Sequence, residues 1–212
     1  MNTFAQLWRA ICGKPDADWL AIYRHPDWFS PHIPVWQAML ADFAGKPGLR
    51  FLEVGSFEGR SAVWTLQNIL TDRSSSLTCV DTFEGGDDLA SMDLTGLRET
   101  FMANVKPWRH QVTLLAGQSG VVLRQLHTPF DFIYVDASHI AEDVMEDAAL
   151  TWRLLRPGGL MAFDDYEWNG PPDPRLRPRA GIDAFLYTRR PNSVRVLYRG
   201  IQLFVQKEGG AP

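Results

Sequence analysis

The chain has 212 residues, 45% of them hydrophobic and 22% charged, with a net charge of −4. This length favours a single α/β domain, the 8 Trp, 12 Phe and 5 Tyr exclude a disordered chain, and the charge balance disfavours a strongly basic nucleic-acid binder. No apolar run reaches the roughly 18 residues of a membrane span, and the N-terminus lacks the basic start and apolar core of a signal peptide. Two cysteines, Cys12 and Cys79, cannot form a disulfide framework, so we expect a protein of the reducing cytoplasm.

Residues 1–48 differ from the rest and form a predicted helical extension of the same domain. They hold four of the eight tryptophans, and breaks at 13–15 and 30–34 separate short helices. Apolar residues at helical spacing predict a helix over 35–43. We expect the extension to pack on the core formed by residues 49–212, where it is also a candidate cover for an acceptor pocket.

After residue 48, short apolar runs alternate with longer segments of helical period. Predicted strands cover 49–54, 76–80, 112–115, 130–135 and 159–163, and predicted helices cover 59–70, 94–105, 120–126 and 140–155. Continuous apolar strands alternating with helices indicate a parallel sheet covered on both faces. A Pro/Arg-rich loop over 170–179 precedes a predicted helix over 182–188 and strands over 193–198 and 201–206, which flank a two-residue turn at Arg199-Gly200. The chain therefore reads as an α/β sheet ending in an antiparallel hairpin.

The turn after the first predicted strand carries the first chemical signal. Gly55 permits a sharp turn and Gly59 lets the helix start close to a ligand, as in a dinucleotide-binding turn. Phe57, however, stands where that turn needs a glycine to admit a pyrophosphate, and Glu53 places a carboxylate at the strand end. This turn suits a cationic ligand group better than a phosphate.

S-adenosylmethionine fits this chemistry, because it carries an ammonium and a sulfonium and no phosphate. Asp81 ends the second strand, 28 residues after Glu53, and a carboxylate there can accept both ribose hydroxyls. The alternative is an ordinary turn with a solvated acid at each strand end.

In these motifs the chain resembles the class I S-adenosylmethionine-dependent methyltransferases over residues 49–206. Residues 53–61 look like their first motif, 79–81 like the ribose-binding acid, 116–119 like the segment beside adenine, and 155–159 like the turn before the fifth strand. The resemblance implies a Rossmann-like, mostly parallel sheet of seven strands in the order 3-2-1-4-5-7-6. It also implies a set of cofactor-binding residues, namely Glu53, Gly55, Ser56, Gly59, Ser61, Asp81, Thr82, Phe83, Gly117, Gln118, Ser119 and Asp136.

Two rival functions use the same fold. A nicotinamide-dependent oxidoreductase is disfavoured by Phe57 and Glu53. A non-catalytic cofactor-binding protein would keep Glu53 and Asp81 without needing acids further along the chain.

Three such acids follow the fourth and fifth predicted strands. Asp136 ends the fourth, and Asp164 and Asp165 end the fifth, so neighbouring parallel strands bring them to one edge. Because three close carboxylates repel unless a cation joins them, we expect a divalent ion, with Mg²⁺ preferred and Ca²⁺ or Mn²⁺ as alternatives.

Residues 135–139 and 164–166 further resemble a subgroup of small-molecule O-methyltransferases that includes macrolide-sugar enzymes. The resemblance implies that Asp136, Asp164 and Asp165 hold the metal, that Asp136 lies at the reacting centre, and that His139 is the general base. A neutral imidazole, with its ordinary pKa of about 6.5, can take a hydroxyl proton at neutral pH. Two alternatives stay open: a metal-independent methyltransferase acting on another acceptor, and a His139 that only caps the following helix.

Charge is distributed unevenly around these acids. Residues 131–170 carry nine acids against two arginines, whereas residues 171–200 carry seven arginines against Asp173 and Asp183. The arginines indicate either a solvated surface or recognition of an acidic group. We expect a small-molecule acceptor, acidic or a sugar or polyol; without interleaved aromatics, nucleic acid is unlikely. Sequence alone sets no oligomeric state.

Overall fold

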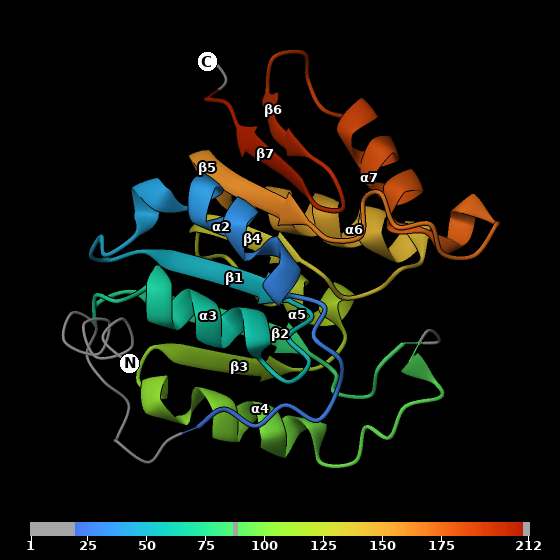
Figure 1. The fold of residues 1–212 in the computed structure, drawn as a ribbon. Helices are drawn as coiled ribbons and strands as arrows, with labels where there is room; N and C mark the ends of the chain where they lie inside the picture. Colours follow the sequence, from blue (N-terminus) through green and yellow to red (C-terminus); the bar gives the residue numbers. More distant parts are fainter. Residues whose placement is uncertain (1–19, 87–88, 210–212) are drawn as a thin grey trace.

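The computed structural model describes residues 20–86 and 89–209, which form one sheet between two layers of helices (Figure 1). Its strands are β1 (Arg50–Val54), β2 (Ser76–Asp81), β3 (Val112–Ala116), β4 (Phe130–Val135), β5 (Leu155–Phe163), β6 (Val194–Arg199) and β7 (Leu203–Lys207). They lie in the order β3-β2-β1-β4-β5-β7-β6. The neighbours from β3 to β5 pair in parallel, while β7 is antiparallel to both β5 and β6. The predicted fold class and strand order are confirmed.

Within the described residues, three helices cover each face of the sheet. One face packs against α2 (Ile33–Met39), α3 (Arg60–Asn68) and α4 (Leu97–Val105), and the other against α5 (Ser119–Gln125), α6 (Ala141–Trp152) and α7 (Pro178–Tyr187) (Figure 1). Short 3-10 helices are η1 (Ser30–His32), η2 (Ala41–Phe43), η4 (Lys106–Trp108) and η5 (Pro174–Leu176). No helix in the described part of the chain is long and apolar enough to cross a membrane.

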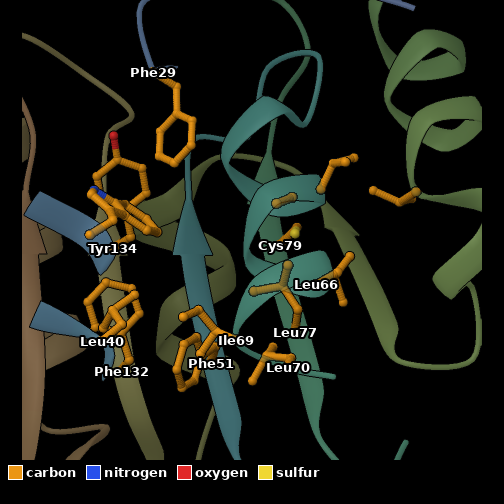
Figure 2. Close-up of a cluster of buried hydrophobic side chains, with 14 of the residues drawn as sticks. Phe29, Leu40, Phe51, Leu66, Ile69, Leu70, Leu77, Cys79, Phe132 and Tyr134 are labelled. Atoms are coloured by element: carbon orange, nitrogen blue, oxygen red, sulfur yellow. The ribbon is translucent and has the colours of Figure 1, made fainter. Parts of the chain in front are cut away.

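Side chains that alternate along the strands fill two separate cores. Phe51, Cys79 and Phe132 point to the layer that contains α2, α3 and α4, and Figure 2 shows them with their neighbours from α3. Leu52, Val80 and Ile133, each one position along, point to the layer of α5, α6 and α7. Both faces are apolar, which is why these strands read as continuous hydrophobic runs.

Several predicted boundaries are wrong. The helix predicted over 140–155 ends at Trp152, because Leu155 already pairs with Phe130 in the sheet. The helix predicted over 182–188 begins at Pro178, whose fixed φ and missing N–H suit the first turn of a helix.

Two other local predictions also need correction. The connection between β6 and β7 has three residues, 200–202, closed by the Gly200 N–H on the Gln202 carbonyl (3.0 Å), so the two-residue turn is wrong. The helix predicted over 35–43 is divided into α2 and η2. The extension is described only from residue 20, so Cys12 and the first two tryptophans lie outside the described residues.

Candidate active site

The turn between β1 and α3 lies directly against the end of β4. Gly55 has φ +86, and a Cβ atom there would lie 1.9 Å from the Asp136 carbonyl oxygen. Gly59 has φ +80 at the start of α3, where a Cβ would lie 2.9 Å from the Phe101 ring. Neither position has room for a side chain, and the close approach at Gly55 brings the turn next to Asp136.

Asp81 organises this turn through backbone hydrogen bonds. One carboxylate oxygen accepts the N–H groups of Ser56 (2.6 Å) and Phe57 (2.8 Å), and the other accepts the N–H of Phe83 (2.6 Å). Phe83 itself is 9% exposed and its ring lies 5.5 Å from that of Phe101. The carboxylate thus sits between the β1 turn and the chain after β2, the place at which a ribose-binding acid is expected.

Glu53 faces the interior of the turn. It is 3% exposed, and its carboxylate accepts hydrogen bonds from the hydroxyls of Ser61 and Ser56 (3.2 Å for Ser56). Burial raises the pKa of Glu53 to about 7, against the opposing effect of these bonds. Its predicted contact with a cationic ligand stays a prediction, since the described carboxylate is engaged by the protein.

The turn after β3 completes the part of the site built around β1. The Gly117 N–H donates to the Asp81 carbonyl (2.9 Å), which keeps the turn beside β2. Gln118 precedes α5, and Ser119 begins it and hydrogen-bonds to Asp147. Asp147 is 2% exposed, and burial raises its pKa to about 7.

Three predicted residues meet at the ends of β4 and β5. Asp136, His139 and Asp165 each offer a ligand atom, and these atoms lie within 4.8 Å of one another. The His139 Nε2 atom is 2.8 Å from an Asp165 carboxylate oxygen. Asp165 has φ +54, a left-handed conformation that is unusual for a residue other than glycine and turns the chain at the strand end.

Asp164 is oriented differently. One carboxylate oxygen accepts the Asp165 N–H (2.8 Å), and the other lies 2.5 Å from the Tyr134 hydroxyl, which is also 2.9 Å from an Asp136 oxygen. Asp164 and Asp136 therefore both accept from the hydroxyl of Tyr134. Its role as a direct metal ligand stays a prediction.

Burial and mutual repulsion raise the pKa of Asp136 above its ordinary value, with Asp164 and Asp165 as the repelling charges. The pKa of Asp164 is raised by burial and by the charge of Asp165. A cation would relieve this repulsion. Carboxylate oxygens suit hard divalent ions such as Mg²⁺ and Mn²⁺, so the residues present fit a divalent ion.

Sequence reasoning missed two aromatic side chains of this site. Tyr134 is an interior residue of an apolar strand, and only its pairing of Asp136 with Asp164 reveals a polar role. The Trp168 ring lies 4.7 Å from that of His139 and forms a wall beside the cluster. Its position three residues after Asp165, just before the Pro/Arg-rich loop, was the available signal.

The N-terminal segment is fastened to the β1 turn and to α4. Glu58, 3% exposed, accepts the N–H groups of Arg24 (2.7 Å) and His25 (3.3 Å), and the Asn104 side chain bonds both backbone groups of Ile22 (2.7 Å each). The segment then continues past the carboxyl end of the sheet to α2 (Figure 1). The extension therefore packs at the edge that carries the acids.

Two arginines meet on the other side of the same edge. The guanidinium carbons of Arg179 and Arg199 lie 5.1 Å and 5.4 Å from the centre of the Tyr166 ring. Asp183 accepts the Tyr166 hydroxyl (2.8 Å) and pairs with Arg179 (3.5 Å). Tyr166 follows Asp165 directly, so the side chain that both arginines contact is the next residue after the acids at the end of β5.

Comparison with known proteins identifies what this arrangement is similar to. A family model described as a methyltransferase domain matches residues 52–166. No curated protein sequence matches the chain. An O-methyltransferase from Bacillus cereus, solved with S-adenosylhomocysteine, has a TM-score of 0.62 at 18% identity and covers 88% of this chain and 84% of its own.

Two further solved structures share the fold. The O-methyltransferase TomG from Streptomyces achromogenes, involved in tomaymycin synthesis and solved with S-adenosylmethionine, has a TM-score of 0.61 at 19% identity over 83% of this chain and 80% of its own. An rRNA methylase from Streptococcus thermophilus has a TM-score of 0.58 at 9% identity over 89% of this chain and 100% of its own. At these identities the likeness concerns the fold.

Proposed function

The chain belongs to the methyltransferase domain family, and from this premise we propose that it methylates a hydroxyl group of a small molecule with S-adenosylmethionine and a divalent cation. Family membership decides against the nicotinamide-dependent alternative. The convergence of Asp136, His139 and Asp165 within 4.8 Å, beside the β1 turn, carries the proposal. The solved O-methyltransferases of the same fold agree with it.

The cofactor, when bound, supplies a methyl group on a positively charged sulfur. The chain's part is to hold it at the ends of β1, β2 and β3. Asp81 would accept the ribose hydroxyls, the Gly117–Ser119 turn would flank the adenine, and Gly55 leaves the backbone of the turn open to the methionine end. Most of the rate gain then comes from placing two reactants in line.

A divalent cation, when bound, lowers the pKa of an acceptor hydroxyl and orients it. Asp136 and Asp165 would hold the ion, with Asp164 supporting them through Tyr134. The His139 Nε2 atom lies 2.8 Å from an Asp165 carboxylate oxygen, which can only accept, so that nitrogen donates and His139 would take the hydroxyl proton on its other ring nitrogen, Nδ1. Trp168 would support one side of the His139 ring and exclude water from it.

The His139–Asp165 contact also supports a metal-free route, in which Asp165 orients His139 as the base. The two routes differ in their response to chelation. Methyl transfer from radiolabelled S-adenosylmethionine to catechol, measured with Mg²⁺ and with EDTA, separates them. Loss of transfer in EDTA and its return with Mg²⁺ supports the cation; full transfer in EDTA supports the metal-free route.

We further propose that the acceptor carries an acidic group. Arg179 and Arg199 place two guanidinium groups around Tyr166, with Asp183 as the acid that touches this cluster in the described residues. A carboxylate or phosphate on the acceptor would offset their mutual repulsion. Faster methylation of 3,4-dihydroxybenzoate than of catechol, abolished by Arg199→Gln, would support this; equal rates would contradict it.

A further inference from the structure

We propose that Trp36, Gln202 and Tyr134 form a directional hydrogen-bond chain that positions the carboxylates of Asp136 and Asp164. The helix α2 of the N-terminal extension would thereby contribute to the acid cluster, beyond its part in packing. The identity of the ligand that the carboxylates bind rests on the proposed function. The hydrogen bonds between these side chains are observed in the structure.

The hydrogen-bond chain connects α2, the turn between β6 and β7, and β4, which are distant in sequence. The Trp36 indole N–H donates to the Gln202 side-chain oxygen (2.8 Å), and the Gln202 amide donates to the Tyr134 hydroxyl oxygen (3.4 Å). The Tyr134 hydroxyl then reaches Asp164 (2.5 Å) and Asp136 (2.9 Å). Trp36 and Gln202 are 1% exposed and Tyr134 is 2% exposed. Figure 2 shows the Tyr134 hydroxyl at the end of the core towards which β1 runs.

The direction of the chain follows from its first member. An indole N–H can only donate, so the Gln202 oxygen must face Trp36 and its NH₂ group must face Tyr134. The Tyr134 oxygen then accepts, and its single proton points to the two acids. Because one proton serves both carboxylates, their oxygens are drawn to one point, and the orientation of Asp136 becomes defined before any ligand arrives.

Removing the Trp36 indole N–H should allow the direction of these hydrogen bonds to reverse. In Trp36→Phe an aromatic ring remains but the indole N–H is lost, so the Gln202 amide is no longer oriented and can present its oxygen to Tyr134. The tyrosine proton would then serve Gln202, and the carboxylates would lose their shared donor. Tyr134 is the partner that hydrogen-bonds directly to the carboxylates, and losing such a partner typically changes metal affinity by about 10- to 100-fold.

Mn²⁺ binding, followed by the electron paramagnetic resonance signal of the free ion, tests this inference. Trp36→Phe should weaken Mn²⁺ binding by about tenfold, and Gln202→Leu, which leaves Tyr134 without a competing acceptor, should weaken it less. Gln111→Leu is the matched control, because Gln111 is 5% exposed and donates to the carbonyls of Leu70 (2.9 Å), Asp72 (3.1 Å) and Ser75 (3.2 Å) at the opposite edge of the sheet. It should lower the stability and leave Mn²⁺ affinity unchanged. If all three variants lose stability and bind Mn²⁺ like the wild type, the chain has only a structural role and the inference is wrong.

A second measurement does not depend on a metal. In a ¹⁵N-labelled protein, Asp164→Asn should shift the Trp36 indole signal through Gln202 and Tyr134, while the indole signal of Trp152 stays in place. An unchanged Trp36 signal would overturn the chain. A wild type that binds no Mn²⁺ would refute the proposed cation site instead, and the indole signal would still decide the positioning role.

Discussion

Replacing Asp147 with asparagine should stabilise the protein increasingly as the pH rises. Asp147 is 2% exposed on α6, and burial raises its pKa from 3.8 to about 7. In the unfolded chain the carboxyl ionises at its ordinary pKa, so between these values the native state retains a proton that the unfolded state releases. The native state therefore loses stability as the pH rises from about 4 to about 7.

The size of the effect follows from the shift. At about 1.4 kcal/mol per unit, a pKa raised from 3.8 to about 7 corresponds to about 4 kcal/mol. About 3 kcal/mol of this is lost between pH 5 and pH 8, the range in which unfolding is convenient to measure. Asp147→Asn does not titrate and keeps an oxygen that can accept the Ser119 hydrogen bond.

Urea unfolding at about pH 5 and about pH 8 measures the difference between variant and wild type. The stabilisation by Asp147→Asn should grow by about 3 kcal/mol between the two conditions. Asp143→Asn, an exposed position on the same helix, should change stability by no more than about 0.5 kcal/mol at either pH. A stabilisation by Asp147→Asn that is the same at both pH values would refute the reasoning from burial.

Three further predictions concern the site. Asp81→Ala should weaken S-adenosylhomocysteine binding in calorimetry at least tenfold, since two N–H groups of the β1 turn and one after β2 lose their acceptor; unchanged affinity would remove Asp81 from the site. Gly55→Ala should prevent cofactor binding or folding, because its Cβ would lie 1.9 Å from a carbonyl oxygen, whereas Gly48→Ala, with φ +70 and open space, should cost about 1–2 kcal/mol in unfolding; equal costs would argue against the clash. His139→Gln should reduce the rate of methyl transfer about 100-fold with little change in Mn²⁺ affinity; a matching loss of Mn²⁺ affinity would make His139 a ligand rather than the base.

The strands of the sheet could be predicted because each one carries its own pattern of apolar residues in the sequence. Buried parallel strands are apolar on both faces, so runs such as Phe130–Val135 stand out from the helices between them. The acids that follow two neighbouring strands could be placed together for the same reason. The strand order itself came from the resemblance of the motifs.

The contacts that orient the site were beyond sequence reasoning. The Tyr134–Gln202 contact spans 68 residues and has no periodic signal, and Tyr134 reads as one more apolar strand residue. Glu53 was expected to face a ligand, but its burial and the hydroxyls that surround it depend on how α3 packs on β2. The start of α7 was misjudged because helical period alone does not show that Pro178 opens the helix.

The central claim is a cation site built from the acids of β4 and β5. Mn²⁺ titrated into the protein saturated with S-adenosylhomocysteine tests it most directly, with the free-ion resonance signal as the readout. We predict one bound ion per chain in the wild type, none in Asp165→Asn, and one in Asp131→Asn, which alters an acid at the opposite end of β4 that pairs with Arg156 (2.6 Å). A wild type that leaves the Mn²⁺ signal undiminished would contradict the account.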